Sequence, residues 1–331
     1  MNIIQRLILV TLLVGSSSTV AATLQPRIIG GIVSVANGWP SVVSLQLVAP
    51  SGTVIGPFCG GNLIASKWVL TAAHCMFDDA GKQLRLQDLQ VLIGTNRVDT
   101  STGGEFKPVA NIFVHPSFNP KTFDADLALL ELAYPVEYSS MAIYPVAPVA
   151  YPNVPESRAL ATVVGWGATA FANGSPVASS FSAQLREVEV PVITNELCQS
   201  VYAGLTRNML CAGYADGGKD SCAGDSGGPL MVRLQSGEYQ QAGIISTGNG
   251  CAQRDAYGIY TRTANYLTWI NIYTNNAAPK SNPVAASGSG SLAPIGILLL
   301  ALAGVTRAWR SRRRVRQTLV HRLDGIGHRR A

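Results

Sequence analysis

Histidine is scarce in this sequence, which holds only four among 331 residues. Any chemistry that needs an imidazole must use one of them. His321 and His328 lie in a basic C-terminal tail, where we expect them to be solvated, and His115 precedes a proline in an expected surface turn. His74 follows an apolar strand that breaks into small residues, in the run VLTAAHC at 69–75. It is the candidate for a functional histidine, and the alternative is a structural core histidine.

The sequence also lacks any pair of cysteines at the Cys-x-x-Cys spacing, which argues against a zinc site. Its cysteines are even in number, six. In a chain with an export signal, this number indicates a disulfide framework, although sequence alone does not choose the pairing. The cysteines are Cys59, Cys75, Cys198, Cys211, Cys222 and Cys251.

The most telling stretch is residues 220–229, which read DSCAGDSGGP. It sets Ser226 among glycines, beside one acid and six residues after another. A serine hydroxyl is a poor nucleophile unless a base takes its proton and donors receive the developing charge. Flanking glycines let backbone N–H groups approach a substrate carbonyl. A short Gly-x-Ser-x-Gly alone would indicate only an exposed turn, so the interpretation depends on a base elsewhere.

A neutral imidazole needs an acceptor on its far nitrogen to select the tautomer and stabilise the cation. Asp126 opens the apolar run at 127–132, so we expect it to be partly buried and to have partners. Asp124 is the competing candidate, but it lies earlier, in a polar turn. We prefer Asp126 as the partner of His74.

These three motifs, TAAHC at 71–75, DLALL at 126–130 and GDSGGP at 224–229, resemble the signatures of trypsin-like serine endopeptidases of the chymotrypsin fold. The likeness runs from about residue 28 to about residue 276. The resemblance implies Ser226 as nucleophile, His74 as general base and then acid, and Asp126 as orienting carboxylate. It further implies an oxyanion hole from the N–H groups of Gly224 and Ser226, and support of Asp126 by Ser246.

The resemblance also implies a specificity pocket (S1) with Asp220 at its base and Gly248 and Gly258 in its walls. A buried carboxylate there selects Arg or Lys, because an apolar side chain would leave the charge unpaired. Thr247 stands where the family usually has tryptophan, which alters the surface for substrate residues upstream of the cut. Thr95 stands where a carboxylate would be expected in the loop that binds calcium in some relatives, so calcium dependence is not expected. No cofactor and no metal are expected.

The run RIIGG at 27–31 resembles the activation site of the family. Cleavage after Arg27 would free the amino group of Ile28, which in the family pairs with the aspartate next to the catalytic serine, here Asp225. Arg27 itself fits the expected specificity, so the activating protease is another enzyme or the protein itself. The family pattern also implies three disulfides: Cys59–Cys75, Cys198–Cys211 and Cys222–Cys251.

Short apolar runs separated by Gly, Pro, Asn and Asp predict an all-β protein. The resemblance refines this to two six-stranded antiparallel β-barrels, about residues 28–138 and 139–263, with the active site between them. We expect a helix at 195–202 and a terminal helix at about 264–276, which carries apolar residues at helical spacing. The predicted strands are residues 41–48, 62–71, 90–94, 127–132, 161–165, 229–234 and 241–246.

Both ends of the chain carry sorting signals. Residues 1–22 have Arg6, an apolar stretch and small residues before Ala22, as in a signal peptide, and 23–27 would be an activation propeptide. A Gly/Ser/Pro linker at 277–291 precedes a short apolar segment at 292–306 and an Arg-rich tail at 307–331. This order resembles bacterial sorting tags of the GlyGly-CTERM type, which implies transient membrane contact. The alternatives are a permanent anchor or an amphipathic tail on the membrane surface.

The net charge of +6 does not indicate nucleic-acid binding, because residues 307–331 hold nine arginines and one aspartate, a net of +8. Without these residues, Arg6 and Arg27, the remainder has 14 basic and 18 acidic residues, a net of −4. The sequence therefore predicts a secreted or cell-surface zymogen of a serine endopeptidase, acting on proteins or peptides with Arg or Lys before the cut. The alternative function is a non-catalytic binding protein on the same fold.

Overall fold

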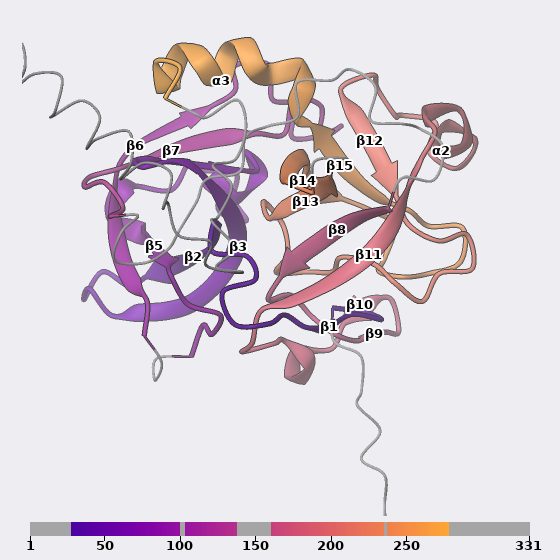
Figure 1. The fold of residues 1–331 in the computed structure, drawn as a ribbon, viewed down its shortest axis with the longest axis horizontal. Helices are drawn as coiled ribbons and strands as arrows, with labels where there is room; N and C mark the ends of the chain where they lie inside the picture. The colour runs from indigo at the N-terminus through magenta and orange to yellow at the C-terminus, as the bar shows by residue number, and fades with distance from the viewer. Residues whose placement is uncertain (1–27, 100–102, 138–159, 235–236, 278–331) are drawn as a thin grey trace, which may run out of the picture. The chain divides into compact units, whose positions relative to one another are not determined.

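Two antiparallel β-barrels make up the described part of the chain, residues 28–99, 103–137, 160–234 and 237–277 of a computed structural model. They lie side by side, and a helix crosses the outside of the first barrel (Figure 1). The predicted all-β class with two six-stranded barrels is confirmed.

The first barrel closes on itself in the order β2-β3-β4-β7-β6-β5, with β5 paired back to β2. Its interior is filled by branched and aliphatic side chains, among them Leu45, Leu63 and Leu129, which are fully buried. Closure leaves no strand edge unpaired, which explains why short strands suffice. The strands are β2 (Val42–Val48), β3 (Val54–Ala65), β4 (Trp68–Thr71), β5 (Leu89–Ile93), β6 (Glu105–Val114) and β7 (Ala128–Leu132).

The apolar run at 62–71, expected as one strand, is a hairpin. Strand β3 ends at Ala65, Ser66 and Lys67 form the turn, and β4 begins at Trp68. Residues 62–65 of β3 and 69–71 of β4 are buried, so only the two-residue turn and the adjoining Trp68 interrupt the buried run.

The second barrel has the strand order β8-β11-β12-β15-β14-β13 and closes where β13 pairs with β8. A short N-terminal strand, β1 (Ile32–Val33), adds to the outside of β11. A two-stranded hairpin of β9 (Phe171–Ala172) and β10 (Ser175–Pro176) lies beside it. The barrel strands are β8 (Leu160–Gly165), β11 (Arg186–Ile193), β12 (Met209–Ala212), β13 (Pro229–Arg233), β14 (Tyr239–Thr247) and β15 (Gly258–Arg262).

Four barrel strands were not predicted from the sequence: β6, β11, β12 and β15. Strands β6 and β11 alternate buried and exposed positions over part of their length, so polar residues interrupt the apolar signal. Strands β12 and β15 have four and five residues, and strands of this length give only a weak local pattern.

The terminal helix follows the second barrel in the chain and packs on the first barrel. The segment expected as one helix at 264–276 begins with a 3₁₀ turn, η4 (Thr263–Tyr266), and continues as α3 (Leu267–Thr274). It ends at Asn275, whose backbone is left-handed at φ 49°. Although α3 follows the second barrel, it lies beside β6 and β7 of the first (Figure 1). Ile270 is buried in the core of the first barrel, and the Tyr273 ring lies 4.6 Å from that of Phe113.

The six cysteines form the three pairs that the family pattern implies: Cys59–Cys75, Cys198–Cys211 and Cys222–Cys251. The first joins β3 to the 3₁₀ turn η1 (His74–Met76). The second joins α2 (Asn195–Val201) to β12, and Thr194 caps this helix by accepting a hydrogen bond from the Leu197 N–H. The remaining 3₁₀ turns are η2 (Leu86–Asp88) and η3 (Ala178–Ser180).

Several predicted segments lie outside the described residues: the signal peptide and propeptide at 1–27, the boundary between the barrels at 138–159, and residues 278–331 with the apolar segment and Arg-rich tail. Among the helices within the described ranges, none has the length and apolar character needed to cross a membrane.

Candidate active site

Asp126 lies at the seam of the two barrels and is fully buried. Its carboxylate accepts hydrogen bonds from His74 N (2.9 Å), His74 Nδ1 (2.7 Å) and Ser246 Oγ (2.5 Å). The first barrel supplies His74 and the second supplies Ser246. A carboxylate is costly to bury without donors, and here they arrive from both barrels. Because Nδ1 donates to the carboxylate, the imidazole is in the tautomer that leaves Nε2 able to accept a proton.

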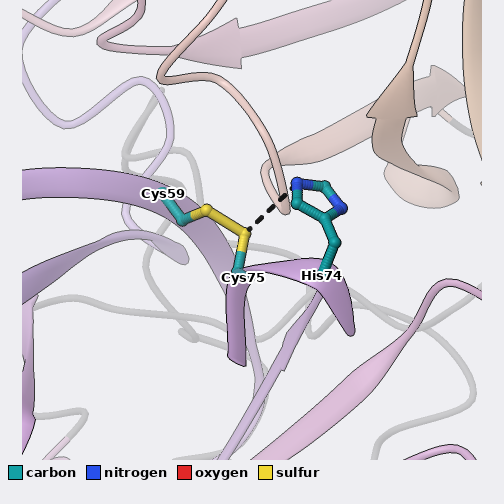
Figure 2. A group of neighbouring side chains, drawn as sticks. All are labelled: Cys59, His74 and Cys75. Atoms are coloured by element: carbon teal, nitrogen blue, oxygen red, sulfur yellow. Dashed lines mark hydrogen bonds between the residues drawn. A yellow bond between two sulfur atoms is a disulfide. The ribbon is translucent and has the colours of Figure 1, made fainter. Parts of the chain in front are cut away.

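The other side of the His74 ring faces the Cys59–Cys75 disulfide. His74 Nε2 lies 3.7 Å from Cys75 Sγ (Figure 2). Cys59, His74 and Cys75 are residue types that can bind a metal ion, but the two cysteines form a disulfide and so offer no thiolate ligand. The disulfide instead ties the residue after the histidine to β3.

Ser226 lies on a tight loop that contacts the first barrel beside the His74 segment. Gly60 N donates to Ser226 O at 2.7 Å. Gly227 follows with φ +78°, and a Cβ there would lie 2.2 Å from Thr71 Oγ1 and 3.1 Å from Ala72 N. Only glycine allows this approach. The loop thus brings Ser226 to the end of β4, next to the segment that carries His74.

Among the hydrogen bonds of the described residues, none joins Ser226 Oγ to His74. The bond between nucleophile and base is often long without substrate and tightens in the Michaelis complex. The structure therefore brings His74, Asp126 and Ser246 into direct contact, and places Ser226 on a loop held against the same barrel.

Backbone donors are available beside Ser226. Within the described part of the chain, the N–H groups of Gly224 and Ser226 donate no hydrogen bond. Gly224 has φ +91°, and a Cβ there would lie 2.9 Å from the Phe181 ring. The left-handed backbone and the close approach of the Phe181 ring together explain why residue 224 is a glycine. Two free amides on one turn are what an oxyanion hole requires.

A cavity of about 300 Å³ is lined by both Ser226 and Asp220. Gly248 and Gly258 line it, and a Cβ at Gly258 would lie 2.9 Å from Asp220 Oδ1. Asp220 is 4% exposed and accepts a hydrogen bond from Ala252 N at 2.9 Å. Burial raises the pKa of Asp220 to about 7. A cationic side chain in the cavity would supply the missing counterion.

Asp225 is a second buried carboxylate next to the serine. It accepts hydrogen bonds from Gly167 N (2.7 Å) and Cys222 N (2.9 Å). Burial raises its pKa to about 7, and no ion pair of the described residues involves it. Nearby, the Ile28 side chain is fully buried in the core of the second barrel, and Ile29 O accepts a hydrogen bond from Asp220 N at 3.2 Å.

His115 begins a turn, as the sequence suggested, with Phe118 N donating to its carbonyl oxygen at 2.9 Å. It is partly buried, and its ring lies 4.9 Å from that of Tyr266 and 5.0 Å from that of Trp269. Burial lowers its pKa. Its partners lie about 150 residues away along the chain, so no local pattern could have revealed the cluster.

The sequence also did not reveal a cavity of about 760 Å³ that His74 lines together with aromatic side chains. Phe123 lies edge-on to the His74 ring, with the ring centres 5.6 Å apart. Phe123 stands three residues before Asp126, so a place near His74 could have been predicted for it. The other rings come from separate loops. The aromatic and histidine residues of the cavity are His74, Phe77, His115, Phe118 and Phe123.

Comparisons with known proteins agree with this geometry. The Trypsin family model matches residues 28–270. The chain belongs to the trypsin family. Over 250 residues it is 39% identical to Trypsin of Sus scrofa, which covers 74% of this chain and 94% of the relative. It is 38% identical to Cationic trypsin-3 of Rattus norvegicus, over 74% of this chain and 88% of the relative. Trypsin-3 of Salmo salar is also 38% identical, over 65% and 82%. The protein is a trypsin-like serine endopeptidase, a hydrolase.

The close approach at Gly227 generates a prediction. Gly227→Ala should lower the free energy of unfolding through two effects: a left-handed backbone, about 1–2 kcal/mol, and overpacking against Thr71, a further ~1–3 kcal/mol. It should also lower kcat/KM about 100-fold, because the loop that carries Ser226 must move away from β4. Urea unfolding and peptide hydrolysis measure the two effects.

Gly52→Ala is the matched control. Gly52 has a similar φ of +83°, but a Cβ there meets no atom within 4 Å. This variant should show only the backbone cost and keep its kcat/KM. Equal losses of stability and activity in the two variants would contradict the contact with Thr71 as the cause.

Proposed function

We propose that the protein hydrolyses peptide bonds after Arg or Lys through an acyl-enzyme. Ser226 Oγ attacks the carbonyl carbon, and His74 Nε2 takes the hydroxyl proton and then gives it to the leaving amine. Asp126 holds the imidazole in its tautomer and stabilises the imidazolium. The N–H groups of Gly224 and Ser226 receive the oxyanion. Water then repeats the attack, with His74 again as base. The observation that carries this proposal is the buried Asp126 carboxylate bonded to His74 Nδ1 and Ser246 Oγ.

The preference for Arg and Lys is supported by Asp220, a buried carboxylate that lines the same cavity as Ser226. A guanidinium or ammonium group entering this cavity pairs with a carboxylate that otherwise has no counterion, which offsets its desolvation. An apolar side chain leaves the carboxylate unpaired. Gly248 and Gly258 leave the width that a long side chain needs. The substrates are therefore proteins and peptides with Arg or Lys at P1, the residue before the cleaved bond.

We further propose that the chain is a zymogen activated by cleavage after Arg27. The new ammonium group of Ile28 would pair with Asp225, whose buried carboxylate lacks a cation. The segment after Ile28 already contacts the specificity loop through the bond from Asp220 N to Ile29 O. Pairing at Asp225 would therefore order both the oxyanion loop and the base of the S1 cavity. The activating protease is another enzyme or the protein itself.

The proposed localisation is the exterior of the cell. The signal peptide at 1–22 would direct export, and the intact disulfides suit an oxidising compartment. The segment at 292–306 and the Arg-rich tail would serve as a sorting tag with transient membrane contact. A non-catalytic binding protein is the alternative, and no feature of the site favours it.

The substrate preference is tested by profiling a peptide library with the activated enzyme. The wild type should cleave after Arg and Lys, and Asp220→Asn should lower kcat/KM for these substrates by about two orders of magnitude or more, because the cation loses its buried partner. The same variant should not lose activity on a Phe substrate. A wild-type preference for Phe would overturn the proposal. In parallel, Ser226→Ala should abolish cleavage and labelling by a fluorophosphonate, whereas a non-catalytic protein would not be labelled at Ser226 in either form.

The raised pKa of Asp220 predicts how cation binding depends on pH. In the empty pocket this pKa is about 7, and a bound cation lowers it, so an arylamidinium inhibitor should release a proton on binding below pH 7. Its affinity should fall as the pH falls below 7, by up to about tenfold per pH unit. Calorimetry in two buffers of different ionisation enthalpy measures the proton release. Asp220→Asn should remove this release, and proton release that persists in the variant would assign it to another group.

Activation is tested with Arg27→Gln. This variant should keep its propeptide and remain inactive toward Arg substrates, as judged by N-terminal sequencing and hydrolysis, because the Ile28 ammonium never forms. A second variant, Asp225→Asn, should be cleaved by added trypsin after Arg27 yet stay at least about 100-fold less active, because the ammonium lacks its buried partner. An Arg27→Gln protein that matures and works normally would contradict the scheme.

A further inference from the structure

The side chain of Asp124, two residues before Asp126, does not contact His74. Its carboxylate instead accepts hydrogen bonds from the second barrel: from Thr206 Oγ1 at 2.6 Å and from Asn208 Nδ2 at 3.1 and 3.2 Å. Thr206 and Asn208 lie in the loop that leads into β12. These three hydrogen bonds link the two barrels directly.

The donors are themselves held in place. Thr206 Oγ1 accepts from Asn208 N at 3.2 Å, and Asn208 Oδ1 accepts from Asn265 Nδ2 at 3.2 Å. Arg262 N donates to Asn208 O at 2.8 Å, which ties the loop to the end of β15. The carboxylate of Asp124 therefore binds to a part of the second barrel that is anchored on two sides.

The backbone around Asp124 needs such an anchor. Phe123 and Ala125, its two neighbours, both have left-handed φ values, 58° and 53°. L-residues adopt this conformation at a cost in free energy, and it persists where surrounding contacts impose it. The turn delivers Asp126 to His74 and also sets the Phe123 ring edge-on to the imidazole. If the turn relaxed, Asp126 and Phe123, which both contact His74, would therefore move.

We infer that Asp124 is a positioning residue for the proposed catalytic carboxylate: its bonds to Thr206 and Asn208 hold the strained turn that sets Asp126 against His74. The inference rests on the proposed role of Asp126. Two further bonds from the second barrel, Ser246 Oγ to the Asp126 carboxylate and Thr261 Oγ1 to Asp126 O, act at Asp126 itself, whereas Asp124 anchors the turn from within.

The test compares Asp124→Ala with Asp124→Asn in the full-length, activated enzyme. Asp124→Ala should lower kcat, per active site titrated with an acylating ester, by about tenfold to 100-fold with little change in KM. Asp124→Asn should recover most of this loss, because its amide oxygen still accepts from Thr206 Oγ1. The control is Asp88→Ala, which removes an acid whose carboxylate bonds within its own turn, to Arg85, and should leave kcat unchanged.

A second readout separates positioning from a general loss of stability. The ascending limb of the pH profile of kcat/KM reports the base in the free enzyme. In Asp124→Ala it should move to lower pH, because an imidazole that loses its carboxylate partner is less basic. His115 and Tyr266 also face Asp124, so His115→Gln is measured alongside and should leave this limb in place.

The outcomes are distinguishable. A lower kcat, a shifted limb and rescue by Asp124→Asn support the inference. An Asp124→Ala enzyme with unchanged kcat per titrated site and an unshifted limb overturns it, even if the protein is less stable. A wild-type enzyme that the ester fails to acylate would instead refute the proposed function, and would do so before any variant is compared.

Discussion

The structure depends on one buried polar group, the carboxyl group of Asp126. It has no contact with solvent, and its donors come from both barrels: His74 from the first, and Ser246 from the second. Neither barrel alone could bury this group, because each would leave part of its hydrogen-bonding capacity unmet. The geometry at His74 is therefore a property of the interface between the barrels. Elements that fix that interface, such as α3 and the Ser226 loop, also fix the site.

Two more buried carboxylates flank Ser226, and each lacks a cation among the described residues. Asp220 and Asp225 both have a pKa raised to about 7 by burial, although backbone N–H groups donate to each. In the proposed mechanism their counterions arrive from outside: the substrate side chain at Asp220, and the new ammonium of Ile28 at Asp225. Specificity and activation would then follow from the same cause, a buried acid that is stabilised only when a cation is delivered to it.

Much of the fold could be predicted from local patterns. The buried runs that became β2, β7, β8 and β14 are apolar enough to be recognised, and the turn residues between them indicate an all-β protein. Strand β6 is partly exposed and β12 is very short, so neither shows a clear local pattern, although β6 pairs with its neighbours in the chain, β5 and β7. The two strands of the hairpin around Ser66 were predicted as one strand, because the residues on both sides of the turn are mostly apolar and buried.

The sequence by itself determined the family, because three spaced motifs contain the residue types that the chemistry of the site requires. It also contained the candidates for the acid, with Asp126 and Asp124 only two residues apart. Tertiary structure alone decided how these two carboxylates divide, one toward His74 and the other toward Thr206 and Asn208. The same holds for the aromatic cluster around His115. Such contacts join segments from different barrels, and hydrogen bonds and ring packing of this kind leave no periodic trace in the local sequence.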